Sequence, residues 1–142
     1  MNEHARAAWR RTSLHVWPES YALASLPRDA VHEAAGLLDP PDGFAHLLID
    51  HDETSLTVER NRWEASSLVE LARAVDGPFR VITFDVALDL DLCGYLAPAA
   101  ERLAVAGIPI VPQCGYSRDH LLVPADRLGA AVRILLRMVA EA

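Results

Sequence analysis

The chain has 142 residues, of which 51% are hydrophobic and 23% are charged, and twenty acidic against thirteen basic residues give a formal net charge of −7. All thirteen basic residues are arginine, which excludes chemistry that needs a lysine amine, such as Schiff-base catalysis or the phosphate-binding lysine of a P-loop. The negative charge and the scattered arginines argue against a nucleic-acid partner, and the hydrophobic content excludes a disordered chain.

The first residues, 1–13, are predicted to be a flexible leader. They are polar and basic, and no apolar segment of a secretion signal follows them before Pro18. Cys93 and Cys114 lie too far apart for a CxxC motif and are expected to be reduced thiols. No apolar run approaches the roughly 18 residues that a membrane helix requires, so we expect a soluble, cytoplasmic protein without membrane contact.

Residues 14–76 carry short apolar segments separated by turn signals. The run 39–43, which contains two prolines and a glycine, is expected to end a helix. The pattern predicts strands at 20–26, 43–50 and 55–59, a short helix within 28–38, and a helix whose apolar stripe comprises Leu68, Leu71, Ala72 and Val75.

Residues 77–142 show the clearest periodicity. Turn chemistry at 76–78 precedes the first strand, and Gly107 would end the first helix. The predicted order is a strand at 79–86, a helix between Gly94 and Gly107, a strand at 108–112, a turn at 115–118, a strand at 120–123, and an amphipathic helix that begins near Asp126.

The two halves have similar internal spacings. Gly43 to Val58 spans fifteen residues, and Gly107 to Val123 spans sixteen. This near-equality predicts an internal repeat whose first copy is degenerate. Two small units of this kind would gain stability by packing side by side, with antiparallel sheets and helices on one face, so the predicted class is α+β. An unpaired sheet edge in such a fold predicts a homodimer.

Three stretches of the second half resemble the ACT-domain family. Residues 88–97 read Leu-Asp-Leu-Asp-Leu-Cys-Gly-Tyr-Leu-Ala, like the family's strand-to-helix turn; residues 103–110 read Leu-Ala-Val-Ala-Gly-Ile-Pro-Ile; residues 116–123 read Tyr-Ser-Arg-Asp-His-Leu-Leu-Val. The chain is similar to small tandem ACT-domain proteins, a group related to aspartate kinase regulatory regions and to animal cellular arginine sensors. The resemblance implies two ferredoxin-like βαββα units, a degenerate one at 14–76 and a second at 77–142.

The resemblance also implies a regulatory module that binds a small molecule, usually an amino acid, without catalysis or a cofactor, and that can serve a regulated enzyme. Residues 92–94 are hypothesised to receive the ligand carboxylate, because free N–H groups and the helix dipole favour an anion there. Asp91 and Asp119 would receive the ammonium group. The predicted ligand residues are Asp91, Leu92, Cys93, Gly94, Cys114 and Asp119.

The chain departs from the family pattern at two of these positions. Cys93 stands where the family favours threonine, and Cys114 where it favours serine. Hydroxyl donors are therefore missing from the predicted pocket, which favours either a more apolar ligand or no ligand.

Two acidic clusters offer an alternative metal interpretation. Asp85, Asp89 and Asp91 have the spacing of a divalent-cation motif, and His46 with residues 50–53 supplies enough ligand atoms for a transition metal. Alternation with apolar residues instead favours a half-buried strand in the first case, and consecutive residues facing opposite ways favour an acidic turn in the second. No metal site is predicted.

Two further functions stay open at this point. Cys114, His120 and either Asp119 or Asp91 could act as nucleophile, base and orienting carboxylate of a small hydrolase or transferase. A ligand-free scaffold that only pairs with other proteins is the other alternative.

Overall fold

The computed structural model describes residues 1–142, and the chain forms two compact units. Unit 1 comprises Met1–Val16 and Val81–Ala142, whereas unit 2 comprises Trp17–Arg80. The predicted division into 1–13, 14–76 and 77–142 differs from this, because the N-terminal segment belongs to the same unit as the C-terminal half. No helix combines the length and the apolar character needed to cross a membrane.

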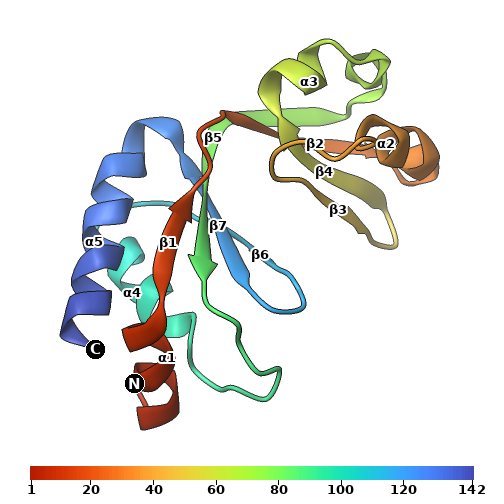
Figure 1. The fold of residues 1–142 in the computed structure, drawn as a ribbon. Helices are drawn as coiled ribbons and strands as arrows, with labels where there is room; N and C mark the ends of the chain where they lie inside the picture. Colours follow the sequence, from red (N-terminus) through yellow and green to blue (C-terminus); the bar gives the residue numbers. More distant parts are fainter. The chain divides into compact units, whose positions relative to one another are not determined.

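Unit 2 follows the order strand, helix, strand, strand, helix, strand. Its strand order is β3-β4-β2-β5, and these strands pair antiparallel, which is the ferredoxin-like arrangement. Its elements are β2 (Tyr21–Pro27), a 3-10 turn (Arg28–Ala30), α2 (Val31–Leu37), β3 (His46–Ile49), β4 (Glu53–Glu59), α3 (Arg60–Glu64), a second 3-10 turn (Ser67–Leu71) and the first part of β5 (Ala74–Asp85) (Figure 1).

The core of unit 2 forms between its central strands and its helices. Ala22 pairs with Val58 and Ala24 with Leu56 across β2 and β4, which places small residues opposite large ones. Trp63 of α3 is buried against this sheet. The unit therefore buries an apolar face of its own.

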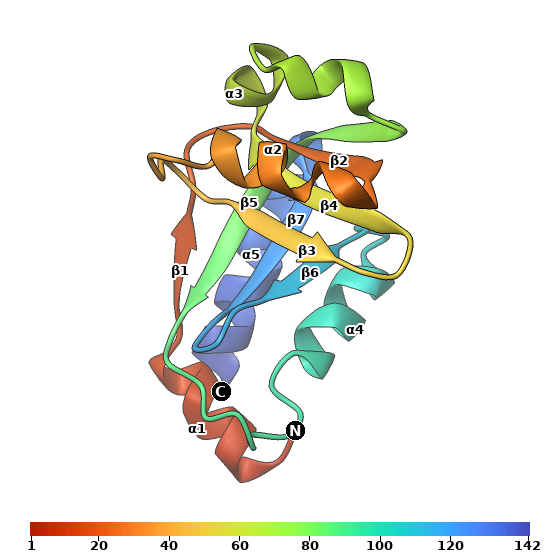
Figure 2. The ribbon, with the colours of Figure 1, turned by 90° about the vertical axis from the view of Figure 1, so that its right-hand side faces the viewer.

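Unit 1 has the same strand arrangement, but its last strand comes from the beginning of the chain. Its strands lie in the order β6-β7-β5, with β1 on the other side of β5 (Figure 2). Its elements are α1 (Glu3–Arg11), β1 (Ser13–Val16), the second part of β5, α4 (Ala97–Val105), β6 (Val111–Cys114), β7 (Asp119–Pro124), a 3-10 turn (Ala125–Arg127) and α5 (Leu128–Glu141).

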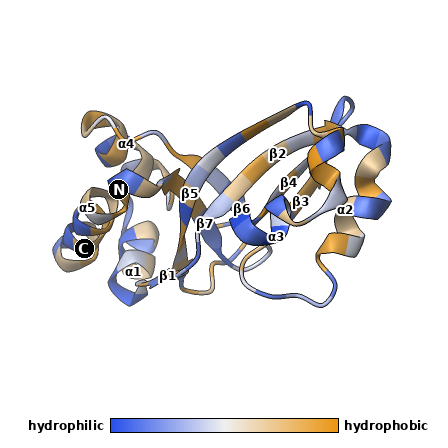
Figure 3. Cartoon of the chain, turned by 90° about the horizontal axis from the view of Figure 1, so that it is seen from above, coloured by the Kyte–Doolittle hydropathy of each residue, from blue (hydrophilic) through white to orange (hydrophobic).

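The helices of unit 1 cover one face of its sheet. Alternate residues of β5 and β7, among them Phe84 and Leu121, form one buried cluster with Leu103 of α4 and Leu135 of α5. Hydrophilic and hydrophobic residues both recur along α5 (Figure 3), as expected of a helix with one buried stripe. The α+β class with antiparallel strands is confirmed.

The prediction of a flexible leader is wrong. Residues Glu3–Arg11 form helix α1, whose N-terminus is capped by the Asn2 side chain. Ala5, Ala8 and Trp9 of this helix are buried, and Trp9 is fully inaccessible to solvent. Spacings of three and four residues put these side chains on one helix face, and the polar residues between them had masked that stripe.

Most other predicted elements are found near their expected positions, with one helix misplaced. The strands within 20–26, 55–59 and 120–123 and the final helix are confirmed. The apolar residues assigned to a helix at 68–75 instead belong to two elements, because Leu68 lies in a 3-10 turn and Val75 in β5. The helix of this region comes earlier, at Arg60–Glu64.

Candidate functional site

The β5–α4 loop, residues 86–96, borders two separate cavities in unit 1. The turn cavity, of about 390 Å³, lies between this loop and the β6–β7 turn. The helix cavity, of about 540 Å³, lies between the loop and α1. The turn cavity is lined by Leu88, Asp89, Leu90, Leu92, Gly94, Tyr95, Leu96, Ala97 and residues 114–119.

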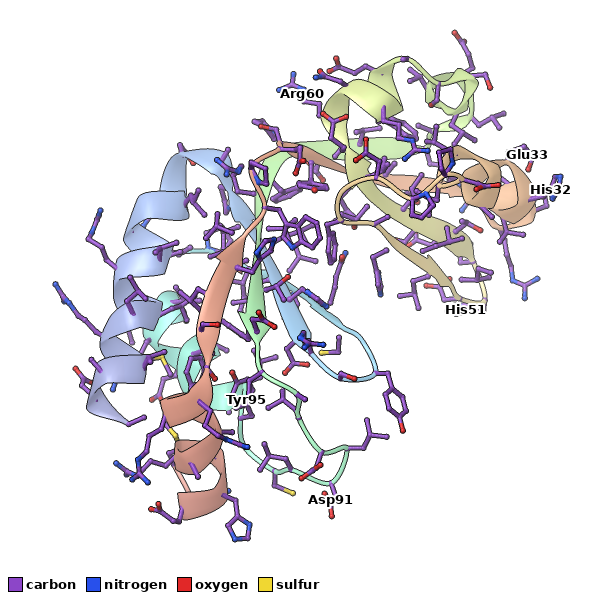
Figure 4. All side chains as sticks on the ribbon, in the orientation of Figure 1. His32, Glu33, His51, Arg60, Asp91 and Tyr95 are labelled. Carbon is purple, nitrogen blue, oxygen red and sulfur yellow. The ribbon has the colours of Figure 1, made fainter.

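The structure brings four of the six predicted ligand residues together. Leu92, Gly94, Cys114 and Asp119 all line the turn cavity. Asp91 and Cys93 line the helix cavity instead. Asp91 lies at the outer end of the loop, away from Tyr95 (Figure 4).

Backbone hydrogen bonds hold together the two segments that line the turn cavity. The Leu88 amide donates to the carbonyl of Ser117 at 2.8 Å, which joins the β5–α4 loop to the β6–β7 turn. The Gly115 amide donates to the Arg118 carbonyl at 2.8 Å and closes that turn, as the sequence predicted. Cys114 and Asp119 are cross-strand partners just before and after it.

Backbone donors at the cavity differ from those first expected. The Leu92 amide already donates to the Asp89 carbonyl at 3.0 Å, so it is not available to a ligand. Helix α4 begins at Ala97 rather than at Gly94, and its N-terminus has no side-chain cap. The amides of Gly94, Leu96 and Ala97 have no acceptor within the chain. These three amides are available donors at the start of α4, beside the cavity.

The one basic side chain of the turn cavity is already paired. Arg118 donates through Nε to Asp85 Oδ1 at 2.9 Å. This ion pair also engages one carboxylate of the alternative metal motif. No group of three or more His, Cys, Asp or Glu side chains is placed to hold a metal ion.

The other acidic cluster is organised as a turn. The Asp50 carboxylate accepts hydrogen bonds from the amides of Asp52 and Glu53, at 2.8 and 2.9 Å. These bonds and the neighbouring Arg28 lower the pKa of Asp50. The carboxylate thus stabilises the β3–β4 connection.

Cys114 faces Asp119 rather than the base that a thiol enzyme would need. Burial, a hydrogen bond to the Asp119 carboxylate and the charge of that carboxylate raise the pKa of the Cys114 thiol to about 11. His120 is the cross-strand partner of Gln113, and its Nδ1 lies 2.7 Å from Thr83 Oγ1. Successive strand residues face opposite sides of a sheet, so Asp119 and His120 diverge.

This geometry predicts that the Cys114 thiol reacts slowly with alkylating reagents. Iodoacetamide at pH 7.5 is expected to label the exposed Cys93 and to leave Cys114 largely unmodified, because the thiolate is the reactive form. Labelling of Cys114 should then rise about tenfold for each pH unit towards its pKa. Peptide mass spectrometry measures both sites in one sample. Rapid labelling of Cys114 at pH 7.5 would restore the thiol-enzyme interpretation.

Tyr95 is a buried residue that lines the turn cavity. Its ring stacks on Trp9 with centroids 4.7 Å apart, and its hydroxyl lies 2.7 Å from Thr12 Oγ1. Burial is the main reason that the pKa of Tyr95 rises to about 12. Sequence reasoning did not include Tyr95 among the site residues, because its partners Trp9 and Thr12 come from the segment that was interpreted as a leader.

Two large apolar side chains stand at the mouth of the turn cavity. Leu90 is 74% exposed and Tyr116 is 82% exposed, and both line the cavity. Leu88, Leu92 and the Tyr95 ring continue this apolar surface inwards. The cavity therefore combines apolar walls with two carboxylates, Asp89 from the β5–α4 loop and Asp119 from the start of β7.

Comparison with known proteins identifies the domain that carries this cavity. The family model of the ACT domain matches residues 74–137. The chain contains an ACT domain. This ACT domain includes β5, α4, β6, β7 and most of α5, and every residue that lines the turn cavity. No curated protein matches the chain.

Solved structures share the fold of both units. A crystal structure of a protein from Agobacterium tumefaciens is 23% identical, covers 90% of this chain and 89% of its own, and has a TM-score of 0.72. A protein of unknown function from Vibrio cholerae is 21% identical, with 94% of each chain covered and a TM-score of 0.72. The regulatory subunit of aspartate kinase from Thermus flavus is 16% identical, covers 89% of this chain and 95% of its own, and has a TM-score of 0.61.

Proposed function

We propose that this chain is a regulatory module without catalytic activity that binds an α-amino acid with an apolar side chain in the turn cavity. The observation that carries this proposal is that Asp119 and the free amides of Gly94, Leu96 and Ala97 line one cavity. The ACT domain and the fold shared with an aspartate kinase regulatory subunit support it.

The two ends of an amino acid have matching groups in this cavity. An ammonium group can donate to the Asp119 carboxylate, and a charge-assisted bond of this kind is stronger than a neutral one. The ligand carboxylate can accept from the free amides at the start of α4, where the helix dipole is positive. The Nε of Arg118 is held by Asp85, so the backbone amides at the start of α4 are the donors proposed for the carboxylate.

The ligand side chain would lie against the apolar walls. Leu90 and Tyr116 at the mouth are largely exposed, and contact with an apolar side chain would remove their surface from water. Cys114 adds a thiol rather than a hydroxyl donor. A leucine-sized side chain suits this lining better than a charged one.

A thermal-shift screen with the twenty amino acids tests the proposal. An apolar amino acid at a hundred times its Kd is expected to add about 2.7 kcal/mol to the free energy of unfolding. Leucinol, which lacks the carboxylate, and isocaproate, which lacks the amine, are matched controls and should give much smaller shifts. Equal shifts with all three compounds, or none with any amino acid, would count against this function and leave the ligand-free scaffold.

The proposed partners are a second copy of the chain and a regulated enzyme. Strand β6 lies at one edge of the unit 1 sheet, and an unpaired edge can accept another strand. Light scattering should give twice the chain mass of 15.6 kDa if this edge pairs in solution. A mass of 15.6 kDa would leave the enzyme as the only proposed partner.

A further inference from the structure

Helix α1 lies outside the residues that match the ACT domain, yet it holds the β5–α4 loop. Three polar contacts join α1 and its two flanking residues, Asn2 and Thr12, to this loop across more than 80 positions of sequence. They reach Cys93 and Tyr95, on either side of Gly94, which lines the turn cavity. The loop has no regular secondary structure of its own, so these contacts fix its backbone.

Asn2 serves the helix and the loop at once. Its Oδ1 accepts the Ala5 amide at 2.8 Å and caps α1, while its Nδ2 donates to the Cys93 carbonyl at 2.9 Å. Gly94 has a φ of +81°, and a Cβ at this position would lie 3.4 Å from Asn2 Nδ2. Asn2 therefore packs closely on the backbone that presents the Gly94 amide to the cavity.

Trp9 and Thr12 hold the next residue of the loop. The Trp9 indole donates through Nε1 to the Tyr95 carbonyl at 2.9 Å. The Thr12 hydroxyl donates to the Ala8 carbonyl at 2.9 Å, which uses its single proton, so the Tyr95 hydroxyl must donate to Thr12 Oγ1. Both ends of Tyr95, its carbonyl and its hydroxyl, are thus fixed by the N-terminal segment.

We infer that Asn2, Trp9 and Thr12 are positioning residues for ligand binding. The N-terminal helix thereby contributes to the free energy of ligand binding without touching the ligand. This inference rests on the proposed function. A loop held in its binding conformation loses less conformational freedom when the ligand arrives, so affinity is higher. Loosening α1 from the loop would weaken binding although no residue of α1 lines the turn cavity.

Asn2→Asp is the sharpest test of the helix contact. An aspartate keeps the oxygen that caps α1 but cannot donate to the Cys93 carbonyl. We expect the Kd for L-leucine, measured by calorimetry, to rise about threefold to tenfold, as the loss of one hydrogen bond would cause. His4→Ala, on the same exposed helix end, is the control and should bind as the parent does.

Thr12 supplies a second variant with a built-in rescue. Thr12→Val removes the acceptor of the Tyr95 hydroxyl, and Thr12→Ser restores it. Weaker leucine binding in the valine variant and recovery in the serine variant would support the inference. Equal binding in both, together with parental affinity in Asn2→Asp, would overturn it.

Hydrogen exchange of the loop amides separates this inference from the proposed function. Without any ligand, Asn2→Asp is expected to speed exchange in residues 88–96 and to leave the β6–β7 strands unchanged. If no amino acid binds the parent protein, the proposed function fails, while the exchange data still decide whether α1 holds the loop. Unchanged exchange in Asn2→Asp would overturn the inference by itself.

Discussion

Replacing Asp119 by asparagine is expected to weaken L-leucine binding about 30-fold or more. The substitution keeps the size of the side chain but removes the only negative charge that comes from the β6–β7 hairpin side of the turn cavity. Losing one partner of a hydrogen-bonded charge pair costs about 2 kcal/mol or more, which corresponds to this factor. Titration calorimetry measures the change directly.

Asp91→Asn is the matched control for this experiment. It makes the same change in net charge on the same unit, but Asp91 lines the helix cavity and not the turn cavity. Its affinity for leucine should stay within about twofold of the parent. If both variants lose affinity equally, net charge rather than contact is responsible. If only Asp91→Asn loses affinity, the ligand amine lies at the outer end of the loop.

The Asp119 variant carries an internal check of the local structure. The Asp119 carboxylate raises the pKa of the Cys114 thiol, so removing its charge should lower that pKa and increase the thiolate fraction at a given pH. Cys114 should therefore react faster with iodoacetamide in Asp119→Asn than in the parent. Faster labelling and lost leucine binding, with an unchanged circular dichroism spectrum, would show that the charge was needed and that the fold is intact.

The β6–β7 hairpin was predictable because all of its determinants are local. Gly107 ends α4 with a φ of +70°, Gly115 closes the turn, and β7 contains a continuous apolar run, Leu121, Leu122 and Val123, that is buried. The final helix was predictable for the same reason, since its apolar stripe lies within one continuous segment. Such features depend on residues only a few positions apart.

The N-terminal segment was not predictable by this reasoning because its partners are distant. Strand β1 has four residues, and it is defined by pairing with β5, where Leu14 faces Phe84. A strand this short carries too little alternation to be recognised without its neighbour. The local signals of a helix were the Asn2 cap, the arginines of the last turn and the spacing of Ala5, Ala8 and Trp9.

The candidate site was predicted only in part, because the sides of its loop are set by contacts with the distant helix α1. The resemblance assigned Gly94 and Asp119 to one ligand site, and both line the turn cavity. It could not decide which side of the loop each neighbouring residue faces. Helix α1 occupies the other side and turns Asp91 and Cys93 towards the helix cavity.

Trp9→Ala is expected to reduce the free energy of unfolding by about 3–5 kcal/mol, the usual cost of deleting a fully buried large aromatic side chain. The indole stacks on Tyr95 and meets the Phe84 ring edge-on with centroids 5.2 Å apart, so its removal leaves a cavity between α1 and the sheet. It also leaves the Tyr95 carbonyl without its donor. Urea unfolding followed by circular dichroism gives the loss.

Trp9→Phe separates the hydrogen bond from the packing. The phenyl ring keeps an aromatic contact with Tyr95 but cannot donate to its carbonyl, so we expect a smaller loss of about 1–2 kcal/mol. His4→Ala, an exposed position on α1, should change stability by less than about 0.5 kcal/mol. If Trp9→Ala were as mild as this control, α1 would be only loosely attached. The N-terminal helix would then have no means of stabilising the ACT domain or its loop.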